Sequence, residues 1–148
     1  MEANEIRRRR AYAALLVGGC GVMAVLALLP WHTYAISVEG AGSFRLDRTG
    51  VESPGENLGR ATLFLSAVLV ALVAWVMAAR GSRPDLDVQA ERPLLLLSLV
   101  IAGALATKLL RDTDFLGTGA WVALVLGAVV AGAGVTLRRT GASVGPGG

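Results

Sequence analysis

The chain has few of the residues that build redox, haem or metal sites. Of its 148 residues, one is a cysteine, Cys20, and one is a histidine, His32. A single cysteine cannot form an internal disulfide, which excludes the four-helix thiol oxidoreductases that need a vicinal cysteine pair. A single histidine excludes a haem held by two histidines of one chain. We therefore expect no cofactor and no metal ion.

Acidic residues are missing from the long apolar stretches. Charged residues make up 17% of the chain and lie between apolar blocks, whereas soluble domains carry about 25%. Proton-coupled transporters generally need an acid inside the membrane, and the apolar runs contain none. The sequence also lacks a Ser-His-Asp set, a metal-ligand spacing and a phosphate-binding glycine loop. These absences predict a protein that is not an enzyme.

Long uncharged runs are what the sequence does contain, and its mean hydropathy is +0.60. Four arginines, Arg7 to Arg10, precede the run from Ala11 to Trp31, which has 21 residues. As a helix with about 1.5 Å of rise per residue, this run matches a hydrocarbon core of about 30 Å. A signal peptide is the alternative, but its apolar part usually has about 7–15 residues and ends at a cleavage site, which is not evident here. We expect a retained membrane helix.

Three further runs predict three further membrane spans. The second run, 61–79, lies between Arg60 and Arg80. The third, 93–110, begins with Pro93, a residue suited to the first turn of a helix, and follows a hydrophilic link. The fourth, 115–137, precedes a short flexible tail at 138–148. The chain is thus expected to be one all-α membrane domain, a bundle of four transmembrane helices with spans at about 11–31, 61–79, 93–110 and 115–137.

The loop 32–60 is the one long polar connection between these runs. Its apolar residues alternate with polar or small ones on both sides of a glycine-containing turn, at Tyr34, Ile36 and Val38 and again at Phe44 and Leu46. Period-two alternation around such a turn favours a β-hairpin. An irregular loop is the alternative.

The positive residues predict the orientation of the bundle, because loops rich in arginine and lysine stay in the cytoplasm. With the N-terminus inside, nine positive residues lie inside and five outside. Both termini are then cytoplasmic in the cell inner membrane, and the loop 32–60 lies outside. The inner set includes the residues at both ends of the chain, Arg7, Arg8, Arg9, Arg10, Arg138 and Arg139.

Small residues recur every four positions in the fourth run, at Gly119, Ala123, Gly127 and Ala131. This spacing places them in one ridge of a helix, where another helix can approach closely. We favour packing of the ridge within the bundle of one chain. Contact of the ridge with a second copy or a partner protein is the alternative.

Charged and polar residues gather where the runs end on the outer side. Lys108 lies four positions before Asp112, so that the two can pair on a helix, and the lysine stem can reach the lipid headgroups. The set either forms a polar mouth for an anionic headgroup or lipid-linked substrate, or consists of ordinary solvated helix-end charges, which we favour. Its members are His32, Arg60, Lys108, Arg111, Asp112 and Asp114.

Two short stretches support a family resemblance. The first run ends in Leu28-Leu29-Pro30-Trp31, and the fourth begins with Gly119-Ala120-Trp121. With an outer loop between them, these stretches make the chain similar to small four-helix integral membrane proteins that are common in GC-rich bacteria. The resemblance implies a fold and a location but no activity.

We expect a non-enzymatic integral membrane protein that acts through helix–helix contacts as an accessory or assembly subunit. The alternative is a small oligomeric carrier or channel with its path between protomers. The expected partners are the lipid bilayer and either a membrane protein or further copies of the chain. A net charge of +3 follows from the arginines that set the topology, so no nucleic-acid partner is expected.

Overall fold

The computed structural model describes residues 2–52, 56–83, 85–111, 113 and 116–142. Each of the four helices that it contains is long and apolar enough to cross a membrane. The prediction of four such helices and a β-hairpin is therefore confirmed. The elements in chain order are α1 (Glu2–Leu28), β1 (Pro30–Val38), β2 (Gly42–Thr49), α2 (Glu56–Ala79), α3 (Asp85–Arg111) and α4 (Thr118–Ala142).

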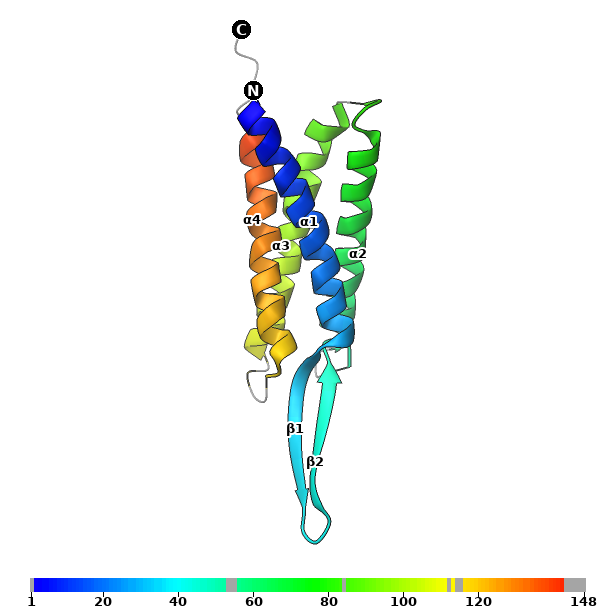
Figure 1. The fold of residues 1–148 in the computed structure, drawn as a ribbon, viewed down its shortest axis with the longest axis vertical. Helices are drawn as coiled ribbons and strands as arrows, with labels where there is room; N and C mark the ends of the chain where they lie inside the picture. The colour runs from blue at the N-terminus through cyan, green and yellow to red at the C-terminus, as the bar shows by residue number, and fades with distance from the viewer. Residues whose placement is uncertain (1, 53–55, 84, 112, 114–115, 143–148) are drawn as a thin grey trace.

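The helices form a bundle in which each packs against two neighbours. Helix α1 contacts α2 and α4, and α3 contacts the same two helices from the other side. Both termini of the chain lie at one end of the bundle, which we call the termini end (Figure 1). The hairpin extends from the opposite end, the hairpin end, along the long axis of the molecule.

The core of the bundle follows a spacing of seven residues, the repeat of helices that pack at small crossing angles. Helix α4, for example, buries Ala123, Val130 and Leu137 completely. The same spacing holds in the other three helices. The buried residues at these positions are Leu15 and Val22 in α1, Leu69 and Val76 in α2, and Leu94 and Ile101 in α3.

The outer surface of the bundle exposes many large apolar side chains. Each helix presents a large apolar side chain outward: Val17 is 69% exposed, Phe64 69%, Leu96 63% and Val125 64%. Helices that are hydrophobic on all sides suit a lipid environment, because water would oppose the exposure of their outer faces. The bundle therefore has the surface of a multi-pass membrane protein.

Three helices begin earlier than the predicted spans: α1, α3 and, by five residues, α2. Helix α4 continues beyond residue 137 to Ala142, so the first part of the expected flexible tail is helical. Helix α1 starts at Glu2, so the arginine run is helical, and a 2.8 Å ion pair joins Arg9 to Glu5 one turn before it. Helix α3 starts at Asp85 and not at Pro93, which lies inside it. Acidic residues in the first turn stabilise a helix N-terminus, and α3 has two there, Asp85 and Asp87. The supposed hydrophilic link is thus largely helical.

The hairpin begins directly where α1 ends, so that Trp31, predicted to lie in the first span, belongs to β1. Its strands pair antiparallel, and the turn between them contains Gly40 at φ 86° and Gly42 at φ 93°, conformations that favour glycine. Successive residues of a strand point to opposite faces, so the hairpin has two faces of different character. Tyr34 pairs with Leu46 and Ile36 with Phe44.

Candidate functional site

Charged side chains meet inside the termini end of the bundle. The Arg8 Nη1 atom lies 2.8 Å from Glu91 Oε1, and Arg8 Nη2 lies 3.4 Å from Asp87 Oδ2. The Nε atom of Arg80 donates a 3.1 Å hydrogen bond to the same Asp87 oxygen, while the Tyr12 hydroxyl donates to Asp87 Oδ1. We call these five residues the charge cluster.

The residues of the charge cluster come from α1, from the end of α2 and from α3. Arg8 and Tyr12 come from α1, Arg80 follows the last residue of α2, and Asp87 and Glu91 come from α3. A Cβ atom built at Gly141 would clash with the Glu91 carboxylate, so α4 passes directly beside the charge cluster. The cluster thus joins α1 to α3, which lie across the bundle from one another.

The charges in the charge cluster balance. Two guanidinium groups face two carboxylates, and the side chains of Arg8 and Glu91 are only 11% and 10% exposed. An ion pair with so little water contact is stable only if each charge keeps its partner. The ion pairs therefore hold together the ends of α1, α2 and α3 at the termini end.

Sequence reasoning missed the charge cluster, although a signal was present. Four consecutive residues of a helix point in directions about 100° apart, so one of four successive arginines must face the bundle once the helix starts before them. Arg8 is that residue, seven positions before the buried Leu15, whereas Arg7, Arg9 and Arg10 are exposed. Arg138 and Arg139 are exposed as well, at the same end of the bundle.

The predicted ridge on α4 packs within the chain. A Cβ atom at Gly119 would lie 2.8 Å from the Pro30 carbonyl oxygen, and one at Gly127 would lie 3.1 Å from Leu105 Cδ1. Ala123 is fully buried and Ala131 is half-buried. Gly119, Ala123 and Gly127 therefore face the chain's own elements.

The closest approach of α4 to α3 follows a different spacing from the predicted ridge. Gly127, Gly134 and Gly141 recur every seven residues along α4. They lie against Leu105, Ser98 and Glu91, which recur every seven residues along α3. The four-residue pattern of small side chains thus missed two of the three glycines at this interface.

The structure describes four of the six residues in the predicted outer set, His32, Arg60, Lys108 and Arg111. Lys108 is 2% exposed, and its Nζ atom lies 5.2 Å from the centroid of the Trp31 ring. The expectation that the lysine reaches the headgroups is therefore wrong, because its stem turns into the bundle. Arg60 and Arg111 are exposed, and Asp112 and Asp114, with the pairing proposed for Asp112, lie outside the described residues.

His32 lies at the root of the hairpin and is fully buried. Its ring stacks on that of Tyr34 with a centroid separation of 6.0 Å. A β-bridge joins His32 to Leu116, and the Gly117 N–H donates a 2.6 Å hydrogen bond to the Trp31 carbonyl oxygen. The segment before α4 therefore ties the hairpin root to the bundle.

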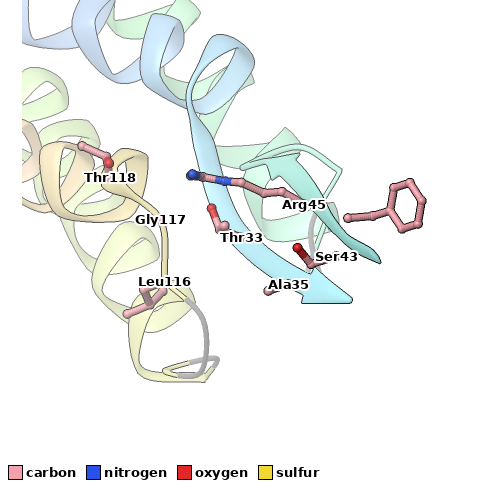
Figure 2. A pocket seen from close by; sticks show the side chains of 8 residues that line it. Thr33, Ala35, Ser43, Arg45, Leu116, Gly117 and Thr118 are labelled. Carbon is pink, nitrogen blue, oxygen red and sulfur yellow. The ribbon is translucent and has the colours of Figure 1, made fainter. Parts of the chain in front are cut away.

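The polar face of the hairpin borders a hollow of about 460 Å³. Thr33, Ala35, Ser43 and Arg45 line it from the hairpin (Figure 2). The opposite wall is the segment that leads into α4. It consists of Leu116, Gly117 and Thr118.

Asp47 neutralises the one guanidinium group in this wall. Thr33 Oγ1 donates a 2.9 Å hydrogen bond to Asp47 Oδ1, and Arg45 Nε donates one of 3.1 Å to the same atom. The Thr33 hydrogen bond, followed by that of Arg45, holds the pKa of Asp47 below its usual value. The Arg45 guanidinium that lines the hollow is thus paired with a carboxylate of the same strand.

The lowered pKa of Asp47 predicts how the hairpin responds to acid. Since the folded form prefers the ionised carboxylate, its stabilising effect is complete above the ordinary aspartate pKa of about 3.9 and is lost as the pH falls through the lower folded-state pKa. Carboxyl ¹³C NMR of the protein in micelles should show this low pKa. Thr33→Val should raise it, whereas Ser37→Val on the same face should not; equal titration in all three proteins would contradict the assignment.

The other face of the hairpin is apolar and exposed. Ile36 is 49% exposed, Val38 48%, Phe44 59% and Leu46 44%. These side chains share one face because the strand register pairs Ile36 with Phe44 and Tyr34 with Leu46. We call Tyr34, Ile36, Val38, Phe44 and Leu46 the apolar hairpin face.

Among the described residues, no three His, Cys, Asp or Glu side chains come together as metal ligands would. Comparison of the chain with protein-family models, with curated proteins and with solved structures finds no match.

Proposed function

We propose that this chain is a non-enzymatic membrane protein, an accessory or assembly subunit that holds a partner protein at the hairpin end. The observation that carries the proposal is the apolar hairpin face. Four of its five side chains are between 44% and 59% exposed. Contiguous exposed apolar side chains on a protein surface are typical of an interaction site.

The position of the hairpin supports a protein partner in preference to lipid. The hairpin continues the long axis of the bundle (Figure 1), and its first strand has nine residues, or about 30 Å at 3.3 Å per residue. If the helices span a bilayer, the tip of such a hairpin lies well outside it. A two-stranded hairpin alone is only marginally stable in water, so a partner that covers its apolar side would stabilise it.

A partner inside the membrane would contact the outer faces of the helices. The glycines of the α4 ridge are occupied by the chain's own helices and hairpin root. Helix α1, in contrast, exposes Ala13, Val17, Cys20 and Ala24 on one side. Helix–helix contact with a partner inside the membrane would use such an exposed face, in which small side chains flank Val17.

The location that we propose is a bacterial inner membrane, with both termini in the cytoplasm and the hairpin outside. Nine of the fourteen positive residues would then lie inside, as membrane proteins generally arrange them. Both termini lie at one end of the bundle, which agrees with an even number of crossings.

Site-specific photo-crosslinking in intact cells tests the proposed function. A photoreactive residue at Phe44, on the apolar hairpin face, should give one discrete crosslinked product with a different protein. The same residue at Ser43, the adjacent position on the polar face, is the matched control and should give much less. The variant Ile36→Ser with Phe44→Ser should lose the partner on gentle purification, whereas Ala35→Ser should retain it.

Two outcomes would contradict the proposed subunit. Equal labelling from Phe44 and Ser43, or none from either, would leave the apolar hairpin face without a protein partner. A crosslink between two copies of the chain would instead favour the oligomeric carrier or channel, whose path would run between protomers.

A further inference from the structure

A groove runs between α1 and α4 at the termini end of the bundle, on the outer surface. Its volume is about 280 Å³, at the lower limit for small-molecule sites. The groove exists because three side chains that border it, Ala11, Ala14 and Ala133, are small. Val129, which is 44% exposed, closes its deeper part.

Two arginines stand at the mouth of this groove. Arg7 and Arg10 both line it, and they are three positions apart, on one side of α1. Neither makes an ion pair or hydrogen bond with another residue of the described parts of the chain. The nearby acids serve other arginines, since Glu5 pairs with Arg9 and the two carboxylates of the charge cluster pair with Arg8 and Arg80.

The groove changes from charged to apolar along the direction in which the helices cross the membrane. Ala14 lies seven residues beyond Arg7, or about 10 Å along the helix. An anionic phospholipid has the same order, with its phosphate at the surface and its acyl chains directed inward. Basic pockets between transmembrane helices on the cytoplasmic side are suited to such headgroups.

We propose that one anionic phospholipid binds in this groove. Its phosphate accepts hydrogen bonds from the guanidinium groups of Arg7 and Arg10, which suit phosphate because they are planar and can donate two bonds each. The upper part of one acyl chain lies against Ala11, Ala14 and Ala133. The two arginines at the mouth favour an anionic lipid over a partner helix. The apolar surface of such a helix would leave both positive charges without a counter-charge.

Native mass spectrometry of the detergent-solubilised protein with added lipid tests the site. The wild-type chain should retain phosphatidylglycerol in preference to phosphatidylcholine with the same acyl chains. Arg7→Gln with Arg10→Gln should weaken phosphatidylglycerol binding roughly 30-fold, because each arginine contributes a factor of about five. The matched control, Arg83→Gln with Arg92→Gln, removes two exposed charges from the same end of the bundle and should keep the affinity.

A second variant keeps the test valid if the arginine variant inserts wrongly. Ala14→Leu fills part of the groove, leaves all charges in place and should also reduce retention of phosphatidylglycerol. Inorganic phosphate should not displace the lipid, because it lacks the acyl chain. The proposed site is overturned if the two double arginine variants lose phosphatidylglycerol equally, or if Ala14→Leu binds it as the wild type does. Displacement of the lipid by phosphate, or a protein bound in the groove, would also overturn it.

Discussion

Replacing Arg8 by alanine should lower the free energy of unfolding by about 3–5 kcal/mol, the usual range when one partner of a buried ion pair is removed. The reason is that Glu91 would keep its charge in a site where its side chain is 10% exposed and would lose the 2.8 Å contact to Arg8. Asp87 would keep Arg80 and Tyr12. Unfolding of the protein in detergent, followed by circular dichroism, measures the change.

The neighbouring arginine is the matched control for this prediction. Arg9 pairs with Glu5 at the same distance, 2.8 Å, but the two side chains are 71% and 55% exposed. Exposed pairs contribute about 0–1 kcal/mol, so Arg9→Ala should hardly change the stability. Equal effects of the two substitutions would mean that Arg8 is solvated like its neighbour.

A double substitution separates the ion pair from the packing around it. Arg8→Met with Glu91→Met removes both charges and leaves Asp87 paired with Arg80. Replacement of a buried ion pair by apolar residues of similar size is often neutral or stabilising. The double variant should therefore recover at least half of the loss caused by Arg8→Ala, and failure to do so would place the destabilisation in lost packing.

Replacing Gly127 by leucine should destabilise the single chain by about 3 kcal/mol, at the upper end of the range for an overpacked core. A Cβ atom at this position would lie 3.1 Å from Leu105 Cδ1 and 3.7 Å from the Ala102 Cα atom. The rest of a leucine side chain would either push α3 away or adopt a strained rotamer. Thermal unfolding in detergent and the elution volume in size-exclusion chromatography are the two measurements.

Gly132 provides the control on the same helix. No atom lies within 4 Å of a Cβ atom built at Gly132, so Gly132→Leu should change the stability by less than about 1 kcal/mol. If Gly127→Leu kept the stability of the monomer but dissociated an oligomer, the α4 ridge would be an intermolecular surface. If Gly132→Leu did so, that surface would be the outer face of α4.

The sequence predicted the helices and the hairpin because both depend on local patterns. Runs without charge specify membrane-spanning helices, and the alternation from Tyr34 to Leu46 specifies strands with one apolar side. The helix starts were harder to predict, since Pro93 resembles a first-turn proline. This error assigned Asp87 and Glu91 to a link and so concealed their inward position.

The buried charges depend on how the helices are rotated in the bundle, which no single run reveals. Arg8 is one of four successive arginines, and its inward direction follows only once the start of α1 at Glu2 is known. Lys108 lies at the end of a run, a position equally suited to lipid headgroups or to the Trp31 ring. Gly134 and Gly141 were missed because the predicted ridge has a spacing of four residues, whereas the contact of α4 with α3 repeats every seven.

The charge cluster also sets the vertical alignment of the helices. Leucine, valine and glycine surfaces fit one another at several offsets along a helix axis, since each turn resembles the next. A slide of α1 by one turn, about 5.4 Å, would separate Arg8 from Glu91 and break their ion pair. The ion pairs that Arg8 makes across the bundle with Asp87 and Glu91 therefore favour one relative height of α1 and α3 over the neighbouring offsets.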